Sequence, residues 1–150
     1  YKGPGRWAFL TELRAKHPDR LFFGSGDIWT AEDVFAMLDV TGVTGVSVAR
    51  GCIGNPWIFR QCRQMMAGHA PTEPTLAEQR DVLLEHLRLS TELHGERGAS
   101  KMMRKFGIRF AKHHPEGHRV KADFIACDSR AAWHRVLEAH YPTDQCTIPT

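Results

Sequence analysis

No stretch of this sequence stays apolar for the roughly 18 residues that a membrane-spanning helix needs. The chain also lacks the charged and then apolar segment of a secretory signal, and it opens on Tyr1 without a methionine, so we expect the natural start to lie upstream. Internal repeats and low-complexity tracts are absent. With 42% hydrophobic and 25% charged residues, the composition is typical of a soluble globular protein.

Cysteine is scarce and is not arranged for metal binding or redox chemistry. None of the four cysteines belongs to a C-x-x-C pair, and their spacing fits no zinc pattern. They are Cys52, Cys62, Cys127 and Cys146. We interpret them as free thiols in a reducing, cytoplasmic environment. His113, His114 and His118 gather near Pro115 without further ligands at useful spacing, so we expect no metal site there.

The first 70 residues alternate between helix and strand patterns. Three helices are expected. The first ends before Pro18, the second runs from the capping residue Thr30 to Gly42, and the third runs from Trp57 to Met66. The apolar runs 21–23 and 45–49 predict short buried strands. This order is typical of parallel strands with crossover helices. Because two strands do not form a stable sheet alone, residues 1–70 are predicted to be part of a larger α/β domain.

Residues 71–150 are predicted to form a helical domain after a proline-containing linker. Thr75 and Glu78 match a capping box at the start of a long helix, which Gly95 and Gly98 are expected to interrupt. Shorter helices are expected near 119–126 and 130–140, and disorder is expected after Pro142. Two apolar stripes are expected to face the core of the bundle: Leu83, Leu84, Leu87 and Leu93, then Met102, Met103, Phe106 and Phe110.

Two polar loops follow the predicted strands. The first contains Ser25, Gly26 and Asp27, and the second contains Ala49 and Arg50 next to a glycine. Glycines bring backbone N–H groups close to a ligand, and an arginine can grip a phosphate with two hydrogen bonds. In (β/α)₈ barrels the phosphate site commonly lies in the loops after the last two strands. On this pattern alone, phosphate binding and ordinary turn chemistry remain equally open.

A longer pattern surrounds these loops. The segments 1–7, 24–28 and 49–59 resemble the tRNA-dihydrouridine synthase family, and Arg50 to Phe59 is similar to its Gly-Arg-Gly-x-x-Gly-Asn-Pro-Trp-Ile-Phe signature. The resemblance extends from Tyr1 to about Tyr141. It implies that residues 1–70 are the C-terminal part of an FMN-binding TIM barrel and that residues 71–150 are a helical bundle domain that holds tRNA.

The same resemblance implies the chemistry. The family reduces tRNA uridines to 5,6-dihydrouridine with FMN and NADPH. Ser25, Gly26 and Asp27 would face the phosphate and ribityl end of FMN, and Ala49 and Arg50 would complete the phosphate grip. Ser25 and Ala49 stand where the family usually has asparagine and glycine. None of the four cysteines matches the family's catalytic cysteine, so we assign no catalytic residue and expect this chain alone to be inactive.

Aromatic and sulfur side chains near the second loop have a simpler interpretation. Cys52 is expected to pack in the core, as free cysteines usually do. Trp57, Ile58 and Phe59 follow a proline at a helix start, so we expect them to pack in the core and not to form a stacking platform.

The segment from Arg97 to Lys121 is strongly basic. It carries a net charge of +7, whereas the rest of the chain carries −4 of the total of +3. Six cations recur at steps of three and four residues, which places them on one helical flank: Arg97, Lys101, Arg104, Lys105, Arg109 and Lys112. A solvated helix face is the simpler interpretation of these cations. Because no acid separates them, a polyanionic partner that offsets their repulsion is the alternative. The resemblance implies that this partner is tRNA, held through phosphates and shape.

Two other functions stay open from the sequence. Another FMN-dependent barrel oxidoreductase acting on a small molecule would explain the loops and leave the basic helix unexplained. A non-catalytic RNA-binding helical module would explain the basic helix and leave the loops as a remnant.

Overall fold

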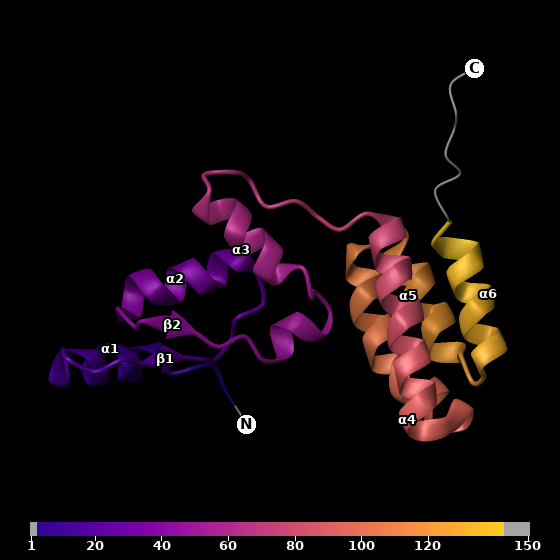
Figure 1. Ribbon diagram of the computed structural model, residues 1–150, viewed down its shortest axis with the longest axis horizontal. Coiled ribbons are helices and arrows are strands. Elements are labelled where there is room, and N and C mark those ends of the chain that lie inside the picture. The colour runs from indigo at the N-terminus through magenta and orange to yellow at the C-terminus, as the bar shows by residue number, and fades with distance from the viewer. Residues whose placement is uncertain (1–2, 143–150) are drawn as a thin grey trace, which may run out of the picture. The chain divides into compact units, whose positions relative to one another are not determined.

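Residues 3–142 are described by a computed structural model, in which the chain separates into two units, Tyr1–Thr72 and Glu73–Thr150 (Figure 1). The described residues hold six α-helices and one sheet of two short parallel strands. The structure is therefore mostly helical, with a small α/β portion in the first unit. The described residues contribute two parallel strands, and the barrel around them stays a prediction.

The first unit alternates helices and strands as predicted. Its elements are α1 (Trp7–Lys16), β1 (Phe23–Gly24), α2 (Ala31–Thr41), β2 (Gly45–Val46), the 3₁₀ turn η1 (Arg50–Ile53) and α3 (Ile58–Met66). The strands pair in parallel, with Phe23 opposite Gly45 and Gly24 opposite Val46. Their carboxyl ends therefore lie at the same edge, and the loops that follow them begin there.

Local signals fix both ends of α2. The Asp33 N–H donates to the Thr30 hydroxyl at 3.3 Å, and the Asp33 carboxylate accepts from the Thr30 N–H at 2.9 Å. This reciprocal pair is a capping box, and it satisfies N–H groups that have no partner inside the helix. Gly42 ends the helix in the left-handed region at φ 67°. The predicted start and end of this helix are confirmed.

The strands are less buried than the sequence predicts. Leu21 and Phe23 are 76% and 71% exposed, and Val46 is only half-buried. Each strand has two residues and one paired neighbour within residues 3–142, so the outer edge of each strand has no partner strand among them. Gly24 is buried because α2 packs directly on it, and an added Cβ there would lie 2.5 Å from the Met37 sulfur.

A small core holds the first unit together. Its buried members come from the loop after β1, from α2, from the segment before β2 and from α3: Ile28, Ala31, Met37, Val43 and Ile58. Cys52 packs against this cluster, as predicted. Ile58 is fully buried, but Phe59 is 51% exposed, so the prediction that Phe59 is a core residue is wrong. Consecutive helical residues point about 100° apart, and only one of this pair can face the core.

The second unit is a helical bundle. It contains α4 (Leu76–Phe110), the 3₁₀ turn η2 (Ala111–His113), α5 (Gly117–Ala126) and α6 (Arg130–His140). The predicted capping box is present: the Glu78 N–H donates to the Thr75 hydroxyl at 3.1 Å, and the Glu78 carboxylate accepts from the Thr75 N–H at 2.8 Å. Gly95 breaks α4 at φ 69° and ψ 165°, whereas Gly98 lies inside the helix.

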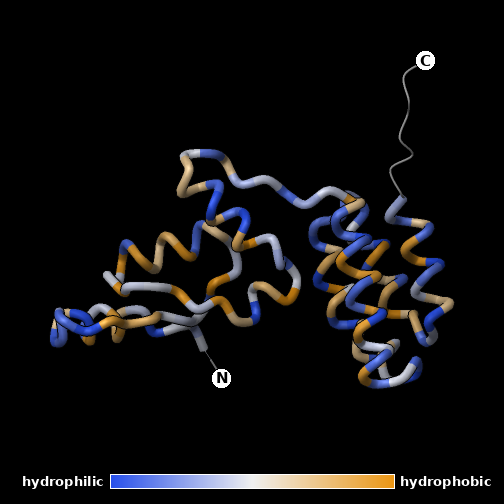
Figure 2. Tube along the Cα trace, in the orientation of Figure 1, coloured by the Kyte–Doolittle hydropathy of each residue, from blue (hydrophilic) through white to orange (hydrophobic). Residues whose placement is uncertain are grey.

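The two segments of α4 fold back on each other, since the rings of His86 and Phe106 lie 4.1 Å apart. Figure 2 shows apolar and polar residues alternating along each helix of this unit. The buried residues come from all three helices: Leu83, Leu87, Met103, Phe110, Val120, Phe124, Trp133 and Leu137. Gly107 permits this packing, because an added Cβ would lie 2.6 Å from the Phe124 ring.

Two of the residues expected in the core of the bundle are exposed. Met102 is 38% exposed and Leu93 is more exposed still. Met102 neighbours the buried Met103 and points about 100° away from it. Leu93 lies next to the break at Gly95, where the helix axis changes direction. The tail after Pro142 and Cys146 lie outside the described residues.

Candidate functional site

Both predicted phosphate loops line one cavity of about 600 Å³ in the first unit. Ser25, Gly26 and Asp27 contribute from the loop after β1, and Ala49 and Arg50 contribute from the loop after β2. The segment Gly3–Arg6 and Trp29 complete the wall. The structure therefore brings together all five residues that the sequence singled out.

The two loops touch each other directly. A Cβ added to Gly51 would lie 2.1 Å from the carbonyl oxygen of Ile28. No larger residue fits at that position without moving one loop, so Gly51 sets the distance between them. Gly51 is therefore needed because it lets the backbones of the two loops pack closely against each other.

Asp27 has a role that the sequence did not reveal. Its backbone is in the left-handed region at φ 54°, and its carboxylate accepts a hydrogen bond from the Gly5 N–H at 2.6 Å. The Trp7 indole donates to the Gly26 carbonyl at 3.0 Å. These two bonds tie the segment before α1 to the first loop. One Asp27 carboxylate oxygen is thus committed to holding the wall of the cavity.

Two cations, Arg6 and Arg50, line this cavity, and Arg50 is the one that the sequence singled out. Its guanidinium carbon lies 5.4 Å from the centroid of the Trp29 ring, which is a cation–π contact. Both side chains are exposed at the cavity. Within residues 3–142, Arg50 forms no ion pair with a carboxylate. Trp29 lies two residues after Asp27 in the sequence. This closeness to the first loop is the signal that could have identified Trp29 as a partner of Arg50.

The cavity offers donors to an anion. Ser25 supplies an exposed hydroxyl, glycine-containing backbone supplies N–H groups, and Arg50 supplies a planar set of donors that suits phosphate. Cys52 is not among these groups, because its thiol donates to the Ala49 carbonyl at 3.0 Å. The arrangement can bind a phosphate-sized anion, and we identify no group in it that is placed for acid–base catalysis.

The rest of the signature around the second loop is structural. The Asn55 amide donates to the Gln61 side chain at 2.8 Å, and the Gln61 amide donates to the Thr72 carbonyl at 3.1 Å. Both side chains are buried. This chain of hydrogen bonds joins the turn before α3 to the segment that leaves the first unit.

The six cations of the basic segment are not equivalent. Arg97, Lys101, Lys105 and Lys112 are exposed, whereas Arg104 and Arg109 are half-buried. Arg104 donates from Nε to the Cys127 carbonyl at 2.6 Å, at the C-terminal end of α5. A carbonyl at a helix end therefore holds Arg104, so this cation is less available to a partner than the exposed members of the flank. Lys105, Arg109 and Lys112 line one groove together.

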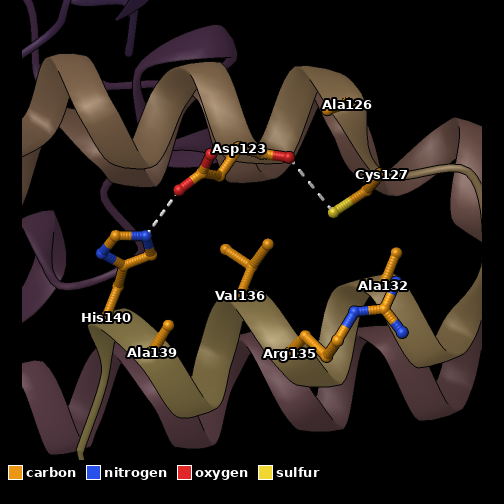
Figure 3. A pocket seen from close by; sticks show the side chains of 8 residues that line it. All are labelled: Asp123, Ala126, Cys127, Ala132, Arg135, Val136, Ala139 and His140. Atoms are coloured by element: carbon orange, nitrogen blue, oxygen red, sulfur yellow. Dashed lines mark hydrogen bonds and ion pairs between the residues drawn. The ribbon is translucent and has the colours of Figure 1, made fainter.

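A separate cavity of about 300 Å³ between α5 and α6 contains cysteine, histidine and aspartate side chains (Figure 3). His140 Nε2 lies 2.7 Å from the Asp123 carboxylate. Cys127 lies at the far end of the cavity, and its thiol donates to the Asp123 carbonyl (Figure 3). Burial raises the pKa of Cys127 to about 11. The thiol is therefore protonated at neutral pH and is not a nucleophile. The contact between Asp123 and His140 joins α5 to α6.

Residues 3–142 contain no group of three histidine, cysteine, aspartate or glutamate side chains that could hold a metal ion. None of the helices there combines the length and the apolar character needed to cross a membrane.

The structure combines a parallel α/β unit, in which two donor-rich loops line one cavity, with a helical unit that contains a basic segment. The family model described as "Dihydrouridine synthase (Dus)" matches residues 1–143. The chain belongs to this family.

The curated relatives that match this chain support its assignment to the family. A probable tRNA-dihydrouridine synthase of Mycobacterium leprae is 33% identical over 122 residues, which are 81% of this chain and 32% of that relative. One from Treponema pallidum is 36% identical over 115 residues, 75% of this chain and 34% of the relative. tRNA-dihydrouridine synthase B of Shewanella oneidensis is 33% identical over 125 residues, 78% of this chain and 36% of the relative. The chain spans about a third of the length of these relatives.

Proposed function

We propose that this chain is the FMN- and tRNA-binding portion of a tRNA-dihydrouridine synthase, which reduces uridine to 5,6-dihydrouridine with NADPH as the reductant. The observation that carries the proposal is the convergence of two loops on one cavity around Arg50, in a chain of the dihydrouridine synthase family. In the whole enzyme, residues 1–70 would complete a TIM barrel and residues 71–150 would contact tRNA.

The residues of the cavity fit the phosphate end of FMN. A phosphate monoester carries close to two negative charges at neutral pH, and Arg50 is a cation without a carboxylate partner in the described structure. Ser25 and the backbone N–H groups of Gly26 and Ala49 would add hydrogen bonds. Asp27 would act mainly by holding Gly5 in the wall. Bound FMN, once reduced by NADPH, would supply the hydride that reduces the uracil ring.

The helical unit would hold tRNA through its basic surface. Four of the proposed contacts are exposed lysines or arginines, and Arg109 is a half-buried fifth. Arg104 would support this surface indirectly, by holding the end of α5. Phosphate contacts position an RNA without reading its sequence. The proposed role of this unit is therefore to orient the tRNA toward the flavin.

Binding of unmodified tRNA to the 150-residue chain tests the RNA half of the proposal. Fluorescence anisotropy at several salt concentrations should give a slope of log K against log salt of about −3 to −4, since about four phosphates would each contribute roughly 0.7–0.9. A small-molecule oxidoreductase would show no measurable tRNA affinity. A non-catalytic RNA module would show the same slope, and product formation in the complete protein separates it from the synthase.

A further inference from the structure

A groove of about 780 Å³ crosses the helical unit between the end of α4 and the start of α5. Basic side chains line both of its walls. Lys105 and Arg109 come from α4 and Lys112 comes from η2, while His118 and Lys121 face the same groove from α5. The structure thus joins three cations of the predicted basic flank to Lys121, which ends the same basic segment of the sequence, and to His118.

The groove has one sign of charge. None of the described residues that line it is acidic. The acid nearest in sequence, Glu116, lies 3.6 Å from Arg119 and 3.9 Å from His140. Lys105, Lys112 and Lys121 form no ion pair with the described residues. A cleft lined by like charges concentrates the electrostatic potential and attracts anions.

The floor of the groove is held in place by buried contacts. The His114 ring accepts from the Glu116 N–H at Nδ1, at 2.9 Å, and Nε2 donates to the His140 carbonyl at 2.8 Å. Gly117 starts α5 against η2, because an added Cβ there would lie 2.4 Å from the Ala111 carbonyl oxygen. The two basic walls therefore face each other at a fixed spacing before any ligand binds, which lowers the entropic cost of binding.

We propose that this groove holds a phosphodiester strand of the tRNA, with Lys121 and His118 contacting phosphates from the wall opposite Lys105 and Lys112. The inference rests on the proposed function and refines it. Arg97 and Lys101 do not line the groove, and Arg104 is bonded to the end of α5. The binding energy is therefore expected to concentrate at one end of the basic segment, instead of spreading evenly along it.

Lys121→Ala and Arg119→Ala form a matched pair for the test. Both residues are exposed cations on α5, but Arg119 lies outside the groove lining and beside Glu116. In the 150-residue chain, Lys121→Ala should weaken tRNA binding about three- to tenfold near 0.1 M salt and flatten the salt slope by roughly 0.7–0.9, the loss of one phosphate contact. Arg119→Ala should change affinity less than about twofold, and Lys121→Arg should retain most of the wild-type affinity.

The outcomes separate the groove from the broader proposal. If wild-type chain binds tRNA but Lys121→Ala and Arg119→Ala weaken it equally, the groove is not the path of the strand, and the tRNA proposal stands. If wild-type chain does not bind tRNA, both proposals fail. Equal affinity for a duplex DNA of similar length would show a general polyanion surface and overturn the assignment to RNA. Circular dichroism of each variant confirms that the helices remain folded.

Discussion

Arg50 is the residue on which the proposed phosphate binding of the first unit depends most. It is a cation at the cavity wall, and it forms no ion pair with a carboxylate of the described residues. In the complete enzyme, Arg50→Ala should weaken FMN binding by about 1.5–3 kcal/mol, the usual scale of a charged hydrogen bond. Arg50→Lys should recover part of this, since lysine lacks the planar set of donors. Flavin fluorescence titration measures all three affinities. Equal affinities of the three proteins for FMN would show that Arg50 does not bind the phosphate.

Trp29 is expected to act through Arg50. A cation–π contact at an exposed site contributes about 0.5–1 kcal/mol, so Trp29→Ala should weaken FMN binding by roughly that amount. Trp29→Phe keeps an aromatic face and should restore most of the affinity. The double variant with Arg50→Ala should be no weaker than Arg50→Ala alone, because the contact is already lost. Additive losses in the same titration would mean that Trp29 acts independently of Arg50.

At the scale of elements, signals that lie close together in the sequence predicted the structure well. The capping boxes at Thr30 and Thr75 mark the starts of α2 and α4, and Gly42 ends α2. Each of these signals acts over three or four residues, so its effect does not depend on the rest of the fold. Pro74, which precedes the long helix, and Gly95, which breaks it, are local signals of the same kind.

Contacts between distant residues could not be predicted from the sequence. Asp27 reaches Gly5 across 22 residues, and Arg104 reaches Cys127 across 23. Asp27 was assigned to FMN by the family resemblance, and Arg104 was assigned to RNA by charge and spacing. Neither kind of inference reveals a backbone partner elsewhere in the chain. Leu21 and Phe23 were expected to be buried from their apolar character, but burial depends on neighbouring strands that these two residues cannot specify.

His86 makes the hairpin within α4 sensitive to acid. Burial, and secondarily the nearby Lys105 ammonium, lower the pKa of His86 below its ordinary value of 6.5. The unfolded chain then binds more protons than the folded one, so this contribution to stability is present above about pH 6.5 and is lost as the pH falls toward the folded pKa.

The free energy of unfolding should therefore fall less between pH 7 and pH 5.5 in His86→Gln than in the wild type, as measured by urea titration. His94→Gln is the control, since His94 is an exposed histidine of the same helix. An unchanged pH dependence in His86→Gln would show that its protonation is not linked to folding.

At the scale of the whole molecule, the chain contains two units with different proposed ligands, and it spans about a third of its relatives. The first unit contains the cavity proposed for the phosphate end of FMN, and the second contains the basic groove proposed for tRNA. Neither unit contributes a residue that we can assign to the reduction itself. Under the proposed function, this chain would supply residues that bind the cofactor and the tRNA, and other parts of the synthase would supply the residues for the reduction.

The formation of dihydrouridine tests this account most directly. Unmodified tRNA is incubated with FMN and NADPH and either the 150-residue chain or the complete protein that contains it, and nucleosides are analysed by mass spectrometry for the gain of two hydrogens on uridine. The account predicts product with the complete protein and none above a no-protein control with the chain alone. Product from the chain alone, or unaltered uridine after incubation with the folded, FMN-loaded complete protein, would contradict it.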